Sequence, residues 1–380
     1  MSTPFVVAAG GTGGHLFPAR ALAGELARRG HCVALATDVR AAAYAAEDLG
    51  VDRHIVRSAT PSGRGTFGAL AAGAVIATGT LQARRLLRRL GARVVVGFGG
   101  YPSLPTLLAA SHAGAHVVLH EQNAVLGRVN RLMLRRAQVL ALSFDETSGY
   151  APRPGLDVAV TGNPVRPAVL AEREAPYRPP EADAALRLLV FGGSQGARLF
   201  GQVVPAALAR LPETLRGRIA VVQQARPEDE SEVARAYGEL GVAAEVRTFF
   251  DDLPRRIGAA HLVIARSGAG SVSELAAIGR PALLVPYAHA MDDHQVANAR
   301  ALTTGGGGVL LVEERFTPEE LAARIDSLAR RPDVLARMAE RARAVGRPDA
   351  VTALADLVEP LANGGFGGHG GEDEARRAAA

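Results

Sequence analysis

The sequence contains no lysine: all 43 Lys and Arg residues are arginine, against 38 Asp and Glu. This absence excludes a Schiff-base lysine, a lysine general base and the G-x-x-x-x-G-K-[ST] phosphate loop, which needs its lysine. Anions must therefore be bound by guanidinium groups, backbone N–H groups or helix dipoles. A GC-rich coding sequence would produce the same bias, so the absence restricts the choice of mechanism more than it reveals selection.

Other scarce residue types narrow the class further. Tryptophan is absent, aromatic residues make up 4% and the net charge is only +5, which disfavours a nucleic-acid-binding surface. Cys32 is the only cysteine, so the chain can form neither an internal disulfide nor a cysteine-built zinc site, which fits a reducing compartment. The first residues lack a basic segment followed by an apolar run, so we expect no signal peptide.

Short apolar runs alternate with segments rich in alanine, leucine and arginine, which predicts βαβ units. Buried parallel strands are expected in the first half at residues 5–9, 32–37, 94–98 and 116–120. After a proline-rich stretch the pattern restarts, with strands expected at residues 186–191, 219–223, 262–265 and 282–286. With 380 residues, 48% of them hydrophobic, the chain is predicted to be α/β, with two doubly wound, Rossmann-like domains facing each other across a cleft.

The domain boundaries follow from composition. We expect a first domain at 1–163, a linker at 164–185 and a second domain at 186–345. Residues 346–362 form a closing segment that either ends the second domain or returns to the first. Residues 363–380 are glycine-rich and then charged, so a disordered tail is expected there.

Both halves open with an apolar strand that runs into a glycine turn, VVAAGGTGGH at 6–15 and LLVFGGSQGA at 188–197. Neither turn fits G-x-G-x-x-G; in the first, the third glycine would fall at Leu16, so a dinucleotide fingerprint is absent. Each turn precedes a predicted helix, whose N–H groups and dipole favour an anion. A plain tight turn is the alternative, which the repetition in both halves makes weaker.

A third candidate site is RSGAGSVSE at 266–274, after a predicted strand. Its small residues leave room for a diphosphate to approach the backbone at a helix start. Ser271 and Glu274 are also spaced as a capping box, which would explain both without a ligand. Since a carboxylate that caps its own helix cannot also hold a ribose diol, the two roles compete, and we favour the ribose.

Further polar residues follow predicted strand ends, where open α/β sheets bind ligands. His15 can act as a general base or donate to a phosphate, and a backbone cap is the alternative. Tyr101 in FGGYPS and the run HEQN at 120–123 are further candidates. The run DDHQ at 292–295 is interpreted as hydrogen bonding to a ligand, because no second His/carboxylate cluster has ligand spacing. We expect no metal and no cofactor.

The segment IATGTLQARRLLRRL at 76–90 predicts a basic amphipathic helix. An anionic membrane surface and an arginine stripe on a solvated helix both explain it. The expected apolar ridge and its flanking cations are Leu86, Leu87 and Leu90, with Arg84, Arg85, Arg88 and Arg89.

Taken together, these motifs resemble the MurG family, the undecaprenyl-diphospho-muramoylpentapeptide N-acetylglucosaminyltransferases of bacterial peptidoglycan synthesis. The resemblance rests on seven strings in the same order between residues 10 and 299: GGTGGHLFPA, FGGYPS, HEQNAVLGRVN, TGNPVR, FGGSQGA, RSGAGSVSELAAIGRPALLVPY and DDHQVANA. It implies a GT-B fold, with UDP-N-acetylglucosamine (UDP-GlcNAc) held mainly by the second domain. The acceptor lipid I, undecaprenyl-diphospho-muramoylpentapeptide, would be held mainly by the first.

The resemblance also implies roles for single residues. On the nucleotide side, Glu274 would hold the ribose, and Phe250 of FFDD stands where the family has an aliphatic residue whose backbone contacts uracil. The family pattern places the following residues near the sugars and the diphosphate: Thr12, Gly13, Gly14, Asn123, Arg166, Ser194, Ala269, Gly270, Ser271, Val272, Ser273 and Gln295. Tyr101 and His120 would lie on the acceptor side. His15 is the candidate base, with Glu121 as the alternative.

The family reading further implies a peripheral enzyme on the cytoplasmic face of the bacterial inner membrane, because the basic segment matches the family's membrane-facing patch. Cell-wall and division proteins are additional candidate partners. The inverting reaction would use the 4-hydroxyl of the muramoyl sugar and release UDP. Three rivals are a nicotinamide-dependent oxidoreductase, another GT-B transferase with a different lipid or natural-product acceptor, and a non-catalytic nucleotide-sugar-binding scaffold.

Overall fold

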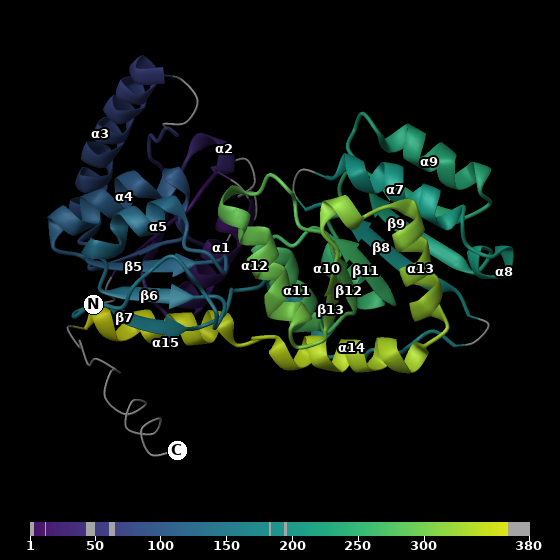
Figure 1. Cartoon of the computed structure of the whole chain (residues 1–380). Coiled ribbons are helices and arrows are strands. Elements are labelled where there is room, and N and C mark those ends of the chain that lie inside the picture. The colour runs from purple at the N-terminus through teal and green to yellow at the C-terminus, as the bar shows by residue number, and fades with distance from the viewer. Residues whose placement is uncertain are drawn as a thin grey trace. The chain divides into compact units, whose positions relative to one another are not determined.

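The computed structural model describes residues 4–11, 13–42, 50–60, 65–181, 184–193 and 196–363. Thr12, Ser194 and the predicted tail beyond 363 lie outside the described residues. The chain divides into two compact units: the first combines Met1–Pro164 with the chain from Asp349 onward, and the second is Val165–Pro348. Each unit contains one parallel sheet covered by helices on both faces (Figure 1).

The first unit has a seven-stranded parallel sheet in the order β3-β2-β1-β4-β5-β6-β7. The central strands are buried runs of valine, alanine and leucine, as the sequence predicts, whereas β3 is a polar, mostly exposed edge strand. The strands are β1 Phe5–Ala8, β2 Val33–Thr37, β3 Asp52–Ile55, β4 Val94–Gly97, β5 His116–Glu121, β6 Val139–Leu142 and β7 Asp157–Val160.

Two apolar clusters cover the faces of this sheet. Helices α1 and α15 pack on one face, and α3, α4 and α5 pack on the other (Figure 1). Polar contacts add to the packing of α15, since the Arg29 guanidinium lies 2.6 Å from the Asp356 carboxylate and 2.7 Å from that of Glu359. The helices are α1 Gly13–Arg28, α2 Val39–Ala42, α3 Gly65–Leu90, α4 Gly100–Ala113, α5 Arg128–Met133, the 3-10 helix η1 Leu134–Arg136 and α15 Ala350–Ala362.

The second unit repeats the design with six parallel strands in the order β10-β9-β8-β11-β12-β13. The strands are β8 Leu186–Phe191, β9 Ile219–Gln224, β10 Ala243–Arg247, β11 Leu262–Ala265, β12 Ala282–Leu284 and β13 Gly308–Leu310. The helices are α6 Pro167–Arg173, α7 Arg198–Leu208, α8 Glu213–Arg216, α9 Glu230–Glu239, α10 Leu253–Ala259, α11 Ala269–Ile278, the 3-10 helix η2 Met291–Asp293, α12 His294–Thr303, the 3-10 helix η3 Glu313–Arg315, α13 Pro318–Ala329 and α14 Pro332–Val345. The stretch 164–185, predicted as a linker, thus contains a helix of this unit.

Strand order reverses beside the first strand of each sheet, between β1 and β4 and between β8 and β11. Open α/β sheets bind ligands in the crevice outside the carboxyl ends of the strands at such a switch point. Four of the sequence motifs lie at these two switch points. The glycine turns follow β1 and β8, FGGYPS follows β4, and RSGAG follows β11. The topology therefore gives each unit one candidate ligand-binding edge.

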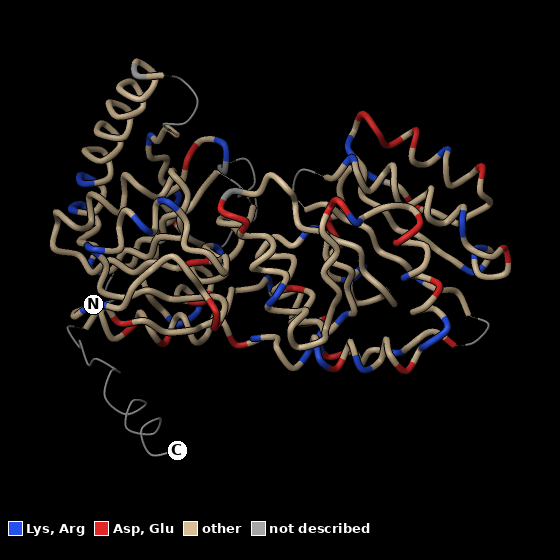
Figure 2. The backbone as a smooth tube through the Cα atoms, in the orientation of Figure 1, with Lys and Arg blue, Asp and Glu red and all other residues tan. Residues whose placement is uncertain are grey.

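The expected apolar ridge at the end of α3 is wrong. Leu86 is 7% exposed and Leu87 is 2% exposed, while Leu90 packs against the apolar cluster under α3 and α4. These leucines stabilise the first unit and cannot face a lipid, although Arg85, Arg88 and Arg89 are exposed and Arg84 is half-buried. Figure 2 shows cationic positions at the lower end of α3. Among the described residues, no helix is long and apolar enough to cross a membrane.

Candidate active site

The first glycine turn is tied to the neighbouring strand ends. Gly11 has a positive φ of 84°, and its N–H donates to Asp38 Oδ1 over 3.1 Å. A Cβ on Gly10 would lie 2.7 Å from Asp38 Oδ1 and 2.8 Å from Pro102 Cβ, so the close approach of the chain requires glycine there. Helix α1 begins at Gly13, directly after the turn, as an anion-binding turn requires.

His15 lies at the end of a chain of hydrogen bonds that the sequence does not reveal. Its Nδ1 is 2.8 Å from Gln122 Oε1, and Gln122 Nε2 is 2.9 Å from Nδ1 of His120. His120 Nε2 is 3.0 Å from the Gly162 carbonyl oxygen. His120 is 0% exposed, so its predicted contact with the acceptor is wrong: it lies below the surface, behind Gln122 and His15.

Burial lowers the pKa of His120 to about 4, from 6.5. Between these two values the unfolded chain binds a proton that the folded chain does not, so the free energy of unfolding falls as the pH drops through this range. From pH 7 to pH 5, His120 alone is expected to lower it by about 2 kcal/mol. Denaturant titrations at both pH values measure this. The His120→Asn variant should show a smaller pH dependence, and an equal dependence in both proteins would contradict the assignment.

Glu121 cannot serve as the alternative base. It is 2% exposed, and each carboxylate oxygen accepts two hydrogen bonds. Oε1 accepts from the backbone and side-chain amides of Asn123 at 3.0 and 3.2 Å, and Oε2 accepts from Gly127 N and Asn130 Nδ2, both at 2.8 Å. Glu121 therefore holds the HEQN segment in place, and it positions Asn123 after β5.

In the second unit the turn after β8 is equally tight. Gly193 has a φ of 81° and Gly196 a φ of 64°, and a Cβ on Gly192 would overlap the Gly196 backbone. The Gly192 N–H donates to Gln224 Oε1 over 3.2 Å, which ties the turn to the end of β9. Gly192, Gly193 and Gly196, the glycines described before α7, thus each stand where another residue would be strained or would overlap its neighbours.

Helix α11 begins at Ala269, after the N-cap residue Gly268, with no side-chain hydrogen bond to the cap. The capping-box alternative is therefore wrong, because Ser271 already lies inside the helix. A helix start without a side-chain cap leaves backbone N–H groups directed outward at the switch point of the second sheet. Ala269, Gly270, Ser271, Val272 and Ser273 form its first turns.

Glu274 pairs with Arg166 instead of capping α11. Arg166 Nε and Nη2 donate to Glu274 Oε1 at 3.1 and 3.0 Å, and Nη2 also lies 3.2 Å from Oε2. The Glu274 side chain is 13% exposed. Burial raises the pKa of Glu274, and the Arg166 guanidinium opposes that shift. The fold thus pairs two residues that lie 108 positions apart in the sequence. The sequence suggests a role for each of them but does not predict that they interact.

The other predicted residues of the second unit lie around the same edge. Phe250, after β10, is 6% exposed. Its ring packs against the Arg256 guanidinium, whose Cζ lies 4.3 Å from the centroid of the Phe250 ring. Gln295, in the first turn of α12, accepts from Tyr287 N over 2.9 Å through Oε1. Its backbone oxygen accepts from Ser267 Oγ over 2.8 Å, which links α12 to the loop between β11 and α11. Tyr101, in the first unit, lies half-buried in the first turn of α4.

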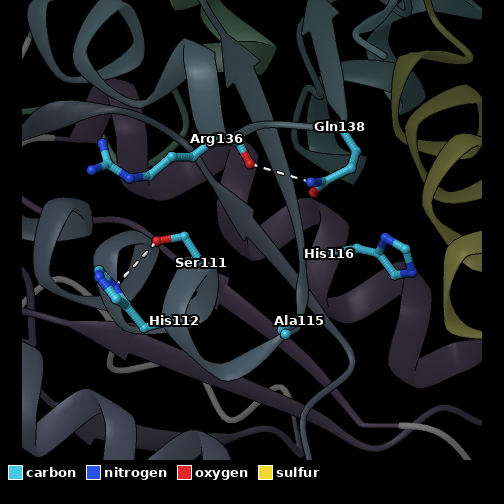
Figure 3. A pocket seen from close by; sticks show the side chains of 7 residues that line it. Ser111, His112, Ala115, His116, Arg136 and Gln138 are labelled. Carbon is cyan, nitrogen blue, oxygen red and sulfur yellow. Dashed lines mark hydrogen bonds between the residues drawn. The ribbon is translucent and has the colours of Figure 1, made fainter.

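Among the described residues, no group of three or more His, Cys, Asp or Glu side chains could hold a metal ion. A pocket of about 360 Å³ does occur in the first unit, lined by residues including Ser111, His112, His116 and Arg136 (Figure 3). It lies beside the amino end of β5, where His116 begins the strand. The candidate site lies at the opposite, carboxyl edge, so this pocket is not part of it.

Comparison with known proteins agrees with this architecture. Residues 5–141 match the Glycosyltransferase family 28 N-terminal domain, and residues 187–354 match the Glycosyltransferase family 28 C-terminal domain. A crystal structure of MurG from Acinetobacter baumannii is 30% identical, covers 94% of this chain and 99% of its own, and superposes with a TM-score of 0.75. The chain is thus a glycosyltransferase of the GT-B fold, built from two Rossmann-like units.

Curated relatives are still closer in sequence. The UDP-N-acetylglucosamine--N-acetylmuramyl-(pentapeptide) pyrophosphoryl-undecaprenol N-acetylglucosamine transferase of Rhodospirillum centenum is 51% identical over 96% of both chains. The protein of the same name from Paramagnetospirillum magneticum is 51% identical over 93% of this chain and 96% of its own. The chain belongs to the MurG family.

Proposed function

We propose that this protein transfers GlcNAc from UDP-GlcNAc to the 4-hydroxyl of the muramoyl sugar of lipid I, with inversion at C1, to form lipid II in peptidoglycan biosynthesis. The observation that carries the proposal is the placement of the family motifs at the carboxyl edges of both sheets, beside the two switch points. The names of relatives that are 51% identical over nearly the whole chain support this substrate pair.

The donor residues belong to the second unit. The diphosphate is proposed to bind at the uncapped start of α11 and at Arg166, and the ribose at Glu274. Negative charge grows on the diphosphate as UDP leaves, and preoriented N–H groups and a guanidinium stabilise it without reorganisation. The Phe250 backbone would contact uracil, and Gln295 the GlcNAc hydroxyls.

The acceptor chemistry belongs to the first unit. His15 is proposed to take the proton of the muramoyl 4-hydroxyl while that oxygen forms a bond to C1 and the C1–O bond to UDP breaks. Asn123, positioned by Glu121, would bind the GlcNAc, and Tyr101 would lie on the acceptor side. Thr12, Gly13, Gly14 and Ser194 keep the roles that the family pattern gives them.

We also propose that α3 binds the anionic cytoplasmic surface of the inner membrane, through a face other than the one predicted. Phe67 is 88% exposed, Leu70 72% and Leu81 54%, and their spacing places them along one side of the helix. Arg85 and Arg88 are exposed on the same side of the helix, closer to the end of α3. The sequence signal for this face is the i, i+3, i+14 spacing of Phe67, Leu70 and Leu81 before the arginines, separate from the leucines that the core uses.

Replacing Phe67 and Leu70 by serine is expected to weaken binding to vesicles of anionic phospholipid by about tenfold or more, because two large side chains no longer leave water. Sedimentation with vesicles measures this. Phe249→Ser is the matched control, since Phe249 is 61% exposed but lies in the second unit. Arg85→Glu with Arg88→Glu should weaken binding mainly at low salt. Unchanged sedimentation of these variants would exclude α3 as the contact.

A UDP-release assay tests the proposed function against its rivals. Release is expected with UDP-GlcNAc and a lipid I analogue, to be much slower with UDP-glucose, and to require the acceptor. Activity is expected to persist in EDTA, since helix N–H groups and Arg166 are proposed to stabilise the leaving group. Binding of UDP-GlcNAc without turnover would favour a non-catalytic scaffold, and turnover only with another acceptor would favour a different GT-B transferase.

A further inference from the structure

We propose that Gln122 and His120 are positioning residues that hold His15 in a single tautomer, with hydrogen on Nδ1 and a bare Nε2. Nε2 is then the atom that accepts the proton of the attacking hydroxyl. The assignment of His15 as the base rests on the proposed function. The tautomer itself follows from hydrogen-bond directions within the first unit alone.

The orientation of the Gln122 amide is determined by a backbone carbonyl. Gln122 Nε2 lies 3.0 Å from the His120 carbonyl oxygen, which can only accept a hydrogen bond. A reversed amide would bring two oxygens together, so the NH₂ group must face His120. Gln122 Oε1 therefore faces His15 Nδ1 at 2.8 Å, and it can only accept. The proton in this bond must belong to His15 Nδ1.

The hydrogen bond between His120 and Gly162 independently gives the same donor and acceptor assignment. The Gly162 carbonyl oxygen, 3.0 Å from His120 Nε2, also can only accept, so His120 carries its hydrogen on Nε2. Burial lowers the pKa of His120 to about 4, so the ring is neutral at pH 7 and its Nδ1 is bare. That nitrogen accepts from Gln122 Nε2 at 2.9 Å. Since His120 is 0% and Gln122 2% exposed, water does not compete for these bonds.

His15 is partly exposed, and its other ring nitrogen lies beside Gly100. A Cβ on Gly100 would lie 3.4 Å from His15 Nε2 and 3.2 Å from its Cδ2, so the glycine gives the ring edge room. The buried carboxylates at this edge of the sheet have other partners: Glu121 binds Asn123, Gly127 and Asn130, and Asp38 binds Gly11 and Arg40. A neutral amide therefore orients the imidazole, whereas a carboxylate would stabilise its charged form. This arrangement suits a base that must be neutral before it reacts.

Nitrogen-15 NMR of histidine-labelled protein tests the tautomer directly. Long-range proton–nitrogen correlations distinguish a protonated Nδ1 from a protonated Nε2, and the spectrum of His15→Ala identifies the His15 signals. The wild type should show hydrogen on Nδ1 and a bare Nε2. In Gln122→Met, which keeps the side-chain length but removes the acceptor, the pattern should change to a mixture of tautomers. A protonated Nε2 in the neutral wild-type ring, or an unchanged pattern in Gln122→Met, would overturn the proposal.

Kinetics test the positioning role. Gln122→Met should lower kcat about tenfold or more, with the KM for UDP-GlcNAc unchanged, because part of the His15 population carries its hydrogen on the wrong nitrogen. Gln122→Glu should move the acid limb of the pH–rate profile about one unit higher, because a carboxylate stabilises the imidazolium. A merely structural role would leave that limb in place. The NMR result needs no substrate, so an inactive wild type with Nδ1 protonated would refute the proposed function but not the tautomer.

Discussion

The His15→Ala variant is expected to lose about 100- to 1,000-fold in kcat, while its KM for UDP-GlcNAc changes little. The general base acts on the acceptor hydroxyl in the transition state, and the proposed donor contacts in the second unit remain. Steady-state kinetics with a lipid I analogue, with donor and acceptor varied separately, measure both constants. His15 is partly exposed, so its removal is not expected to unfold the first unit.

His112→Ala is a matched control for this substitution. His112 is an exposed histidine of the first unit, at the end of α4 and beside the pocket of Figure 3. It should keep the wild-type kcat, since the pocket lies away from the carboxyl edge of the sheet. If His15→Ala instead keeps its kcat and raises the KM for UDP-GlcNAc, His15 is a binding residue and the proposed chemistry is wrong.

The Arg166→Met variant is expected to lower kcat/KM by about 100- to 1,000-fold, because it removes the guanidinium proposed to stabilise the diphosphate. It also leaves the Glu274 carboxylate buried without its partner. Arg166→Lys keeps the charge but loses the two-nitrogen contact, so it should recover only part of the activity. Arg235→Met is the matched control: its partner Glu239 lies in the same helix, α9, and the Arg235 side chain is 66% exposed, so kcat/KM should stay at the wild-type value.

Stability and activity should separate in the pair Arg166–Glu274. Arg166→Met should lower the thermal midpoint, and adding Glu274→Gln should restore part of it, because the second change removes the unpaired buried charge. Activity should stay low in the double variant, since both proposed contacts with the donor are then altered. Wild-type kcat/KM in Arg166→Met would contradict the assignment of Arg166 to the diphosphate.

The sequence alone predicts the parts of this fold that are strongly apolar and regular. The buried strands β8 and β11 have the predicted bounds, Leu186–Phe191 and Leu262–Ala265. The sequence also predicts that the motifs after strand ends lie at the carboxyl edges, and the parallel topology of both sheets places them there. The edge strand β3, Asp52–Ile55, escapes prediction because three of its residues are exposed, two of them charged.

The interactions within the site are not predictable in the same way. The chain from His15 through Gln122 and His120 joins α1, the end of β5 and Gly162, and no local pattern links these segments. The pair Arg166–Glu274 depends on how α6 packs against α11. For α3, the sequence shows two apolar faces on one helix, and only the packing against α4 shows that Leu87 belongs to the core and Phe67 does not.

Analysis of the reaction product tests the central claim most directly. The purified protein is incubated with UDP-GlcNAc and a lipid I analogue, and the product is characterised by mass spectrometry and by the NMR coupling at the new anomeric carbon. The account predicts addition of one GlcNAc, joined in β configuration to the 4-hydroxyl of the muramoyl sugar, with release of UDP. Saturable binding of UDP-GlcNAc with no glycosylated product, or a product joined in α configuration, would contradict it.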